Sequence, residues 1–483
     1  MSKKIGGVVA LVGLCALSLF LVNCGSSSSR PSGVLYVLTQ GNNSVGNNVS
    51  TFAMDLNSGG LSLVNSNAST CPTPATGTNP NPCGLPVDIL LDSTGATAFI
   101  LDQGAPPCPS CTPGENNPIP PAIYPYTVGS DGSLSAPGTA VNWTCTGTNV
   151  SNCSDTATAM VLDAAGHLFV IDYGSSPTPG YPTPTAASPS CPHVPTGPYD
   201  VCPSISVFTM SSGTLTLAPG SPFYLSKIPS ALSAIAFTPP NSTTAQELLF
   251  VTNNQDICSQ NCVAPSPHND NTVSVYSVSS PSGTLTEQPN SPYAVAAVRP
   301  ISVLAVNTNP VGQPTAGGVF VYVGNAVSSG LYPFEVCTAV DNTNCTLAQV
   351  QDNLMFPLRT CPDISCDVPP SSTGQSPIAM MVDPTNKFLY AVAEGSSQVF
   401  GFTIEPGSGK LTALSPNPNL PTGSQPVSMA FHPTVNNTGQ FLFTSNSGST
   451  NISGFTLSTT SGVMNALPSP TTTTTTPSGM TAR

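Results

Sequence analysis

Charged residues are scarce in this sequence. Lys and Arg total 9 and Asp and Glu total 22 of 483 residues, so charged side chains make up 6% and the net charge is −13. An ordinary soluble domain carries ~25% charged residues. Nine cations are too few to neutralise a row of phosphates, which excludes nucleic acid as a partner. Long amphipathic helices draw on Glu, Lys and Arg, so the composition also disfavours a helical fold.

The common motifs of catalysis and metal binding are also missing. The sequence contains four His and one Trp, and neither a GxSxG nor an HExxH motif occurs. Cys108 and Cys111 have the spacing of a redox CxxC, but no βαβ pattern surrounds them. No second Cys or His pair completes a zinc set. The motifs therefore predict no catalytic residue, no metal ligand and no cofactor.

Proline, glycine and small polar residues are abundant instead. The chain has 53 Pro and 41 Gly, together about 19% of its residues, which is below the ~25–30% that is typical of disorder. Hydrophobic residues make up 39%, enough for a packed core. The composition predicts a β protein rich in Pro, Ser and Thr.

The amino terminus has the pattern of an export signal. Lys3 and Lys4 precede an apolar run over residues 5–22. An uncleaved transmembrane helix is the alternative, because eighteen mostly apolar residues are just long enough to span a bilayer.

The end of this run favours export with a lipid anchor. Leu21-Val22-Asn23-Cys24 resembles the bacterial lipobox, although Asn23 stands where a smaller residue is usual. The resemblance implies that residues 1–23 are a lipoprotein signal peptide, that Cys24 is lipidated and that residues 24–33 form a tether. We therefore expect an exported protein of the cell envelope, periplasmic or on the outer surface, whose only contact with a membrane is this anchor.

The cysteines agree with an exported chain. Apart from Cys15 and Cys24, fourteen cysteines remain, and they fall into seven neighbouring couples. An even number of locally paired cysteines in an exported protein predicts disulfides that close loops. The predicted pairs are Cys71/Cys83, Cys108/Cys111, Cys145/Cys153, Cys191/Cys202, Cys258/Cys262, Cys337/Cys345 and Cys361/Cys366.

One pattern recurs along the rest of the chain. Each copy has an apolar strand, a short turn, a second strand that ends in a short polar group, and a third strand with a Gly-rich hairpin. Residues 86–102 and 157–172 are two clear copies of the first two strands. Third strands of this kind occur seven times. The sequence therefore predicts seven similar β units.

The two ends of the chain complete one unit together. Residues 33–38 enter at the position of a second strand, so the first copy lacks its opening strand. Residues 477–483 align without gaps on residues 426–432, an opening strand. Closure of this kind removes the open edges of a radial array of sheets. The predicted fold class is all-β: residues 34–483 form a single seven-bladed β-propeller, closed by the C-terminal strand that completes the first blade.

The repeat residues also resemble known families. Phe250-Val251-Thr252-Asn253 and Tyr322-Val323-Gly324-Asn325 look like the YVTN-type repeat. The strand 205–208, with the SGTL turn that follows it, is similar to lactonase-family propellers. The resemblance implies the propeller fold and, as an expectation, opening or closing of lactones of acidic sugars or muconates.

Nearly all the long insertions are expected on one face of the propeller. In a blade, the second-to-third and blade-to-blade connections share a face, which we call the loop face; the first-to-second turns, such as 92–95 and 163–166, lie on the opposite turn face. Long loops above a rigid scaffold are typical of binding. The alternative is that the insertions have drifted and only resist proteolysis. The insertions span residues 65–85, 104–121, 141–156, 174–203, 254–271 and 351–376.

Polar residues end the second strands and would ring the axis on the loop face. Such a ring could hold water, a cation or a sugar hydroxyl. The alternative is that Asn and Asp simply start the turn that follows each strand. The candidate ligand-binding residues are Asp102, Asp172, Asn253, Asn325, Glu394 and Asn446, with the cations Arg299 and Lys227 beside them.

The sequence favours a binding module over an enzyme. Its ligand would be an unidentified protein or glycan at the loop face, and we expect a monomer. The alternative is a lactonase-like hydrolase related to 6-phosphogluconolactonases, with its site in the mouth of the propeller. Such an enzyme needs cations and an acid or base, but His167 and His432 fall on the turn face. No catalytic residue can therefore be transferred from the family, and an acidic surface opposes the approach of a phosphorylated sugar.

Overall fold

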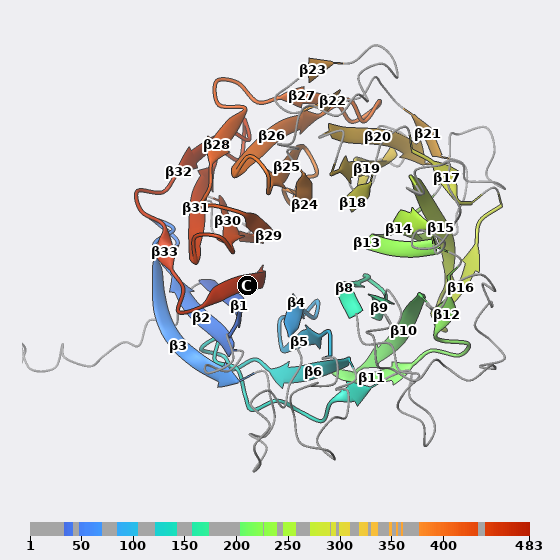
Figure 1. The fold of residues 1–483 in the computed structure, drawn as a ribbon, viewed down its shortest axis with the longest axis horizontal. Coiled ribbons are helices and arrows are strands. Elements are labelled where there is room, and N and C mark those ends of the chain that lie inside the picture. The colour runs from blue at the N-terminus through green and yellow to red at the C-terminus, as the bar shows by residue number, and fades with distance from the viewer. Residues whose placement is uncertain are drawn as a thin grey trace, which may run out of the picture.

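Seven small antiparallel sheets stand in a ring around a central axis in the computed structural model (Figure 1). No helix occurs among the described residues, so no helix among them could cross a membrane. The described residues are 33–41, 48–69, 85–104, 121–142, 157–172, 203–225, 227–238, 245–256, 271–289, 291–295, 299–309, 318–326, 330–336, 347–349, 354–355, 359–360, 376–432 and 440–483.

Each sheet is one blade, and we number the blades in chain order. Blade 1 consists of β1 (Gly33–Gln40), β2 (Asn48–Met54), β3 (Leu61–Ser69) and β34 (Thr476–Ala482). Blade 2 consists of β4 (Pro86–Leu91), β5 (Thr97–Asp102), β6 (Ala122–Thr127) and β7 (Val141–Asn142). Blade 3 consists of β8 (Ala157–Leu162), β9 (His167–Asp172), β10 (Ser204–Ser211), β11 (Thr214–Leu217) and β12 (Phe223–Tyr224).

Four further blades complete the ring. Blade 4 consists of β13 (Lys227–Phe237), β14 (Gln246–Asp256), β15 (Thr272–Ser279), β16 (Thr284–Glu287) and β17 (Tyr293–Ala294). Blade 5 consists of β18 (Pro300–Asn307), β19 (Val319–Asn325), β20 (Gly330–Val336), β21 (Leu347–Gln349), β22 (Leu354–Met355) and β23 (Arg359–Thr360). Blade 6 consists of β24 (Pro377–Val382), β25 (Phe388–Ala393), β26 (Gln398–Ile404), β27 (Leu411–Ala413) and β28 (Asn419–Pro421). Blade 7 consists of β29 (Pro426–His432), β30 (Gln440–Asn446), β31 (Asn451–Leu457), β32 (Met464–Ala466) and β33 (Thr471–Thr472).

The C-terminal strand closes the ring as the sequence predicts. β34 lies antiparallel to β1, with Met480 opposite Val37 and Pro477 opposite Thr39. Val34 and Arg483 exchange two backbone hydrogen bonds of 2.9 and 3.0 Å, which extend this pairing to the last residue. Blade 1 therefore takes its inner strand from the end of the chain and its other strands from the beginning, and the prediction of a closed seven-bladed propeller is confirmed.

The hydrophobic core lies between the blades. Each of seven apolar clusters combines residues of two neighbouring blades, from blades 1 and 2 around the ring to blades 7 and 1. The second strands are sandwiched on both sides, so β9, β19, β25 and β30 are buried along their whole length. Burial on both faces explains why these strands are nearly continuous apolar runs in the sequence.

A fully buried aromatic residue recurs at one repeat position near the end of each second strand. In three blades it is a tyrosine whose hydroxyl donates to a glycine carbonyl in the hairpin of the next blade. These bonds run from Tyr36 to Gly132 (2.7 Å), from Tyr322 to Gly409 (2.9 Å) and from Tyr390 to Gly462 (2.8 Å). The other four blades have Phe99, Phe169, Phe250 and Phe443 there, which pack without a hydroxyl.

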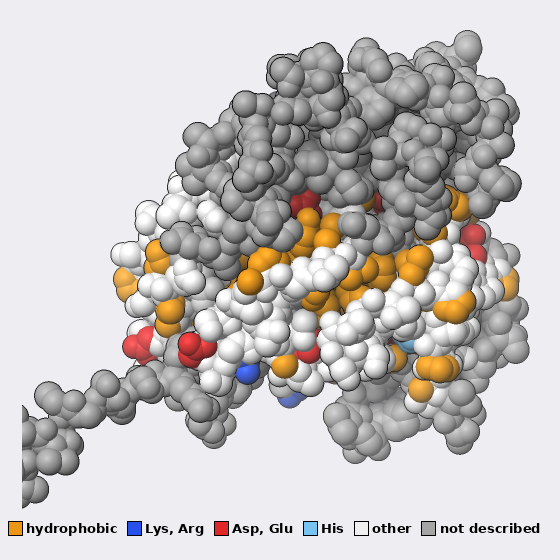
Figure 2. All heavy atoms as spheres, turned by 90° about the horizontal axis from the view of Figure 1, so that it is seen from below, with side chains coloured by type: hydrophobic (Ala, Val, Ile, Leu, Met, Phe, Trp, Pro, Cys, Tyr) orange, Lys and Arg blue, Asp and Glu red, His pale blue; other side chains and the backbone are white. Residues whose placement is uncertain are grey.

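The surface reflects the scarcity of charge. Figure 2 shows one side of the ring, where uncharged and hydrophobic atoms cover most of the described surface and Lys, Arg, Asp and Glu are scattered. Several predictions fall on residues outside those that the structure describes. These are the signal peptide, Cys24 with its lipid, the tether up to residue 32, and all fourteen cysteines of the expected disulfides. They stay predictions.

Candidate functional site

The polar residues that end the second strands all lie at one end of the blades, but their side chains point into the protein. Each pairs with a residue at or near the start of its own inner strand, as Asp102 does with Pro86 and Asn325 with Pro300. The group comprises Asp102, Asp172, Asn253, Asn325 and Asn446, and every one of them is almost completely buried. These side chains therefore lie within and between the blades rather than in an open ring of groups around the axis.

Two of the five donate their amide N–H groups to the third strand of the same blade. The Asn253 amide donates to Thr272 Oγ1 (3.1 Å) and Ser274 Oγ (2.9 Å). In blade 7, the Asn446 amide donates to Asn451 Oδ1 (2.8 Å) and Ser453 Oγ (3.0 Å). In these blades the side chain holds the second strand against the third, which corresponds to the structural alternative considered above.

Asn325 in blade 5 has a different environment. Because Leu331 pairs with Gly324, the residues beside Asn325 are Gly330 and Tyr332, where blade 4 has Thr272 and Ser274. Within the described part of the chain, neither Oδ1 nor Nδ2 of this buried Asn325 has a hydrogen-bond partner. Burial of an unpaired amide is costly, so this position lowers stability unless something else meets it.

Asp102 in blade 2 is a similar case. Its Oδ1 accepts the Gly104 N–H at 2.8 Å, while its buried Oδ2 has no partner among the described residues. Ala122 pairs with Asp102, and Tyr124 follows two residues later, so the third strand offers aromatic surface here. Burial raises the pKa of Asp102 to about 6.

Asp172 and Glu394 complete the set of predicted acids. Asp172 is fully buried and pairs with Ser204. Glu394 directly follows β25, is half-buried, and donates its backbone N–H to the Ser376 carbonyl at 3.0 Å. Glu394 is therefore the predicted acid that remains partly accessible at the loop face.

The predicted cations lie at the same end of blades 4 and 5. Arg299 precedes the inner strand β18 and is exposed, and Lys227 begins β13 and is half-buried. Arg299 has a φ of 62°, which is uncommon outside glycine, and its N–H donates to Asn271 Oδ1 at 3.0 Å. Ser376 and Gln425, at the equivalent positions of blades 6 and 7, have φ values of 40° and 50°. The conformation of Arg299 is therefore a feature of the repeat.

Hydrogen bonds connect Arg299 to Glu394 along the rim of the ring. The Ala326 N–H donates to the Arg299 carbonyl (2.9 Å), and Ser376 Oγ donates to the Ala326 carbonyl (3.3 Å). The Ser376 carbonyl in turn accepts the Glu394 N–H. Lys227, Arg299 and Glu394 thus come from three consecutive blades at one end of the ring, and these hydrogen bonds link the backbones of the last two.

Asp88 is a further acid that the sequence analysis missed. It is the third residue of β4 and the sole carboxylate in the seven inner strands. Its Oδ1 accepts the Ile89 N–H at 2.8 Å, and its Oδ2 accepts the Met160 N–H of blade 3 at 3.0 Å. Asp88 is half-buried, and the loss of solvation raises its pKa to about 6. The other inner strands have small residues there: Ala159, Ala231, Ser302, Ala379, Ser428 and Gly479.

This acid was detectable in the sequence. Alignment of the seven opening strands puts one carboxylate among six small uncharged residues, at a position where each blade approaches the next. A charged side chain at such a position is unusual, and it fits a functional residue as well as a structural one.

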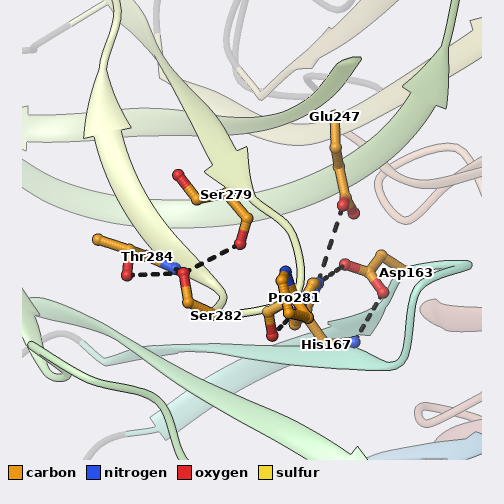
Figure 3. Close-up of polar contacts among 7 residues, drawn as sticks. All are labelled: Asp163, His167, Glu247, Ser279, Pro281, Ser282 and Thr284. Atoms are coloured by element: carbon orange, nitrogen blue, oxygen red, sulfur yellow. Dashed lines mark hydrogen bonds and ion pairs between the residues drawn. The ribbon is translucent and has the colours of Figure 1, made fainter. Parts of the chain in front are cut away.

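A second polar cluster lies on the turn face, between blades 3 and 4 (Figure 3). His167 Nδ1 is 2.6 Å from Asp163 Oδ2 and 3.8 Å from Glu247 Oε2, and all three side chains are buried. Burial, the hydrogen bond to Asp163 and the charge of Asp163 raise the pKa of Glu247 well above its ordinary value. His167 lies on the face where the repeat predicts it, whereas its contact with Glu247, eighty residues further along the chain, is not evident from the repeat.

Comparison with known proteins gives a likeness of fold. No protein-family model matches the chain, and no curated protein sequence matches it. A proposed 6-phosphogluconolactonase from Bacteroides uniformis matches with a TM-score of 0.57 and 12% identity, covering 93% of this chain and 99% of the other. A proposed 6-phosphogluconolactonase from Bacteroides fragilis matches with a TM-score of 0.56 and 12% identity, covering 95% and 99%.

A third solved structure gives the same result. The periplasmic gluconolactonase PpgL from Pseudomonas aeruginosa matches with a TM-score of 0.57 and 15% identity, covering 93% of this chain and 98% of the other. At such low identity the likeness is one of architecture. This chain shares the propeller fold of these proteins over nearly its full length.

Proposed function

We propose that the protein is a lactone hydrolase whose site lies at the loop-face end of the ring axis. Two kinds of observation support this over the binding module that the sequence favours. The fold matches proteins named as lactonases over 93–95% of this chain and 98–99% of theirs. The described residues also offer a carboxylate of raised pKa on the inner strands, and two cations and a further acid on the rim.

Asp88 is the observation that carries the proposal. Opening a lactone requires water to attack the ester carbonyl carbon, the ring C–O bond to break, and the released alkoxide to take up a proton, which yields a hydroxy acid. A base that removes a proton from the attacking water works best with a pKa near the working pH. The pKa of Asp88, about 6, meets this condition, and its two N–H partners hold the carboxylate in place.

The cations on the rim suit the other end of such a substrate. Figure 1 shows β4, which carries Asp88, across the ring from β18 and β24. Arg299 directly precedes β18, and Glu394 directly follows β25, the strand next to β24. Arg299 and Lys227 can hydrogen-bond the hydroxyls or the carbonyl of a sugar lactone. With a net charge of −13, the protein disfavours phosphorylated substrates, so we propose a sugar lactone without a phosphate group.

Turnover of a lactone panel by the purified protein tests the proposal. The panel contains neutral sugar lactones, one phosphorylated sugar lactone and simple aliphatic lactones, and acid release is followed at constant pH against the uncatalysed rate. We expect turnover of a neutral sugar lactone, and a rise in KM for Arg299→Ala. Absence of turnover across the panel contradicts the proposal and favours a binding module with a protein or glycan ligand.

We further propose that this activity is exercised in the cell envelope. The support is the sequence alone: the export signal over residues 1–23 and the lipobox-like Cys24. Mass spectrometry of the mature chain from a bacterial membrane tests it. An acylated Cys24 at the amino terminus is the expected result, and an intact Met1 contradicts it.

A further inference from the structure

The buried cluster of Asp163, His167 and Glu247 combines three side chains of the types that bind metals. Asp163 and His167 come from the turn between β8 and β9 in blade 3, and Glu247 from the start of β14 in blade 4. One ligand-type atom from each lies within 4.8 Å of the other two. Figure 3 shows all three side chains converging from these two blades.

The surroundings of His167 are those of a metal-binding imidazole. The distance from Nε2 to the Pro281 carbonyl, in the hairpin of blade 4, is 3.3 Å, so Nε2 can donate its proton there and leave Nδ1 for another partner. Histidines that bind metals generally donate their other ring N–H to a carbonyl or carboxylate, which fixes the ring. Asp163 is fixed as well, since its Oδ1 accepts the His167 backbone N–H at 2.7 Å.

Glu247 provides an independent sign of a missing ligand. The residue is 8% exposed, and its Oε1 has no hydrogen-bond partner among the described residues. An unpaired carboxylate oxygen in a buried site is costly. Once the proton shared by Glu247 and Asp163 is released, two carboxylates and a neutral imidazole carry a charge of −2 together, which a divalent cation balances.

We propose that Asp163, His167 and Glu247 bind a divalent cation of the zinc type between blades 3 and 4. Imidazole nitrogen and carboxylate oxygen are ordinary zinc ligands, and neighbouring ligand atoms of a tetrahedral site lie ~3.3 Å apart. The separations of 2.6 and 3.8 Å from Nδ1 lie on either side of that value, so small side-chain rotations suffice. Glu247 Oε1 or a water molecule would supply the fourth ligand.

Binding of the cation would release protons and would stabilise the contact between blades 3 and 4. Before the metal binds, any proton between Nδ1 and Asp163, and the proton that Glu247 shares with Asp163, must pass to solvent. Because the ligands come from two blades, the cation would stabilise the folded ring by mass action. This site lies on the turn face, so it does not depend on the proposed lactone hydrolysis at the loop face.

Zinc titration of the full-length protein tests the proposal. The protein is freed of metal with a chelator, its thiols are blocked so that no cysteine binds zinc, and Zn²⁺ is added alone. We expect one equivalent to bind, with a rise in the melting temperature, and Co²⁺ to give the visible absorption bands of a tetrahedral site. Absence of uptake by the thiol-blocked wild type overturns the proposal without reference to any variant.

Variants then assign the ligands. Glu247→Gln and His167→Gln should each weaken zinc binding by on the order of 100-fold or more, whereas Glu405→Gln should leave it unchanged. Glu405 is a matched control because it is an exposed carboxylate in a hairpin of blade 6, bonded to Ser408. Circular dichroism confirms that each variant is folded. Equal zinc affinity in wild type and Glu247→Gln overturns the assignment.

Discussion

The two ends of the blades hold similar polar residues and use them differently. At the loop face, two of the side chains that end the second strands bond within their own blades, as Asn253 does to Thr272 and Ser274. At the turn face, Asp163 and His167 bond to each other within one turn, and Glu247 meets them from the neighbouring blade. The difference teaches that a polar residue at a repeat position becomes available for chemistry only where the neighbouring strand fails to satisfy it.

The same lesson holds within one end of the ring. Blades 4 and 5 carry an asparagine at the equivalent position, but Asn253 faces hydroxyls whereas Asn325 lies beside Gly330 and Tyr332. In blade 2, Asp102 lies opposite Ala122 and keeps one unpaired oxygen. Variants of these residues, and of polar residues elsewhere in the blades, test whether the local environment decides the role of each side chain.

The largest effect is expected for Asp88→Asn on lactone turnover. Removal of a general base costs about 10²–10⁴-fold in rate, so kcat should fall by at least about 100-fold. The amide can accept only one of the two N–H groups of Ile89 and Met160, which costs about 1–2 kcal/mol, but above pH 6 its substitution also removes a carboxylate whose ionised form burial disfavours, so the variant should stay folded. Initial rates of lactone hydrolysis, measured on protein that circular dichroism shows to be folded, give kcat. Asp131→Asn in the same blade, an exposed hairpin carboxylate, is the control and should retain full activity.

The next effect concerns Asp102 and the dependence of stability on pH. The folded-state pKa of about 6 lies above the ordinary value of 3.8, so the folded protein holds this proton more tightly than the unfolded chain. The contribution of Asp102 to stability is therefore greatest below about pH 4 and is lost as the pH rises through 6. Asp102→Asn should remove this loss, and urea unfolding should show a gain of about 3 kcal/mol at pH 8 and none near pH 4.

Asp131 serves as the opposite case for this prediction. The hydroxyl and backbone N–H of Ser133 lower the pKa of Asp131, so this side chain favours folding above pH 4 and loses that effect as the pH falls. A gain for Asp131→Asn at pH 8 similar to that of Asp102→Asn contradicts the role given to burial.

Leucine substitutions of the two asparagines sharpen the comparison between blades 4 and 5. Asn253→Leu leaves Thr272 and Ser274 without their donor and should cost about 1–3 kcal/mol. Asn325→Leu replaces a buried amide without partners by an apolar side chain of similar size, so it should be neutral or stabilising by about 1 kcal/mol. Equal losses in both variants, measured by urea unfolding, contradict the difference in environment.

The smallest effect is expected for the tyrosine hydroxyls between blades. Tyr390→Phe removes the hydrogen bond to the Gly462 carbonyl and should cost about 1 kcal/mol in the free energy of unfolding. Four blades already have Phe at this position, so the backbone accommodates the change. A loss of several kcal/mol indicates that the hydroxyl does more than join two blades.

The sequence predicts the fold well because the repeat is local. Strand alternation, Gly-rich hairpins and the alignment of residues 477–483 with 426–432 are sufficient for seven blades and their closure. The site is harder to predict because burial of each polar residue depends on the strand beside it. Glu247 and His167 are eighty residues apart, and they meet through the packing of two blades. Asp88 could have been found by asking which inner strand departs from the repeat.

The pH dependence of lactone hydrolysis tests the central claim most directly. After subtraction of the uncatalysed rate, kcat/KM of the wild type for a neutral sugar lactone should rise tenfold per pH unit below about 6 and level off above it. This follows because the Asp88 carboxylate must be ionised to act as a base. Asp88→Asn should show neither the rise nor the activity. Turnover that persists in Asp88→Asn with the same pH profile as the wild type contradicts the account.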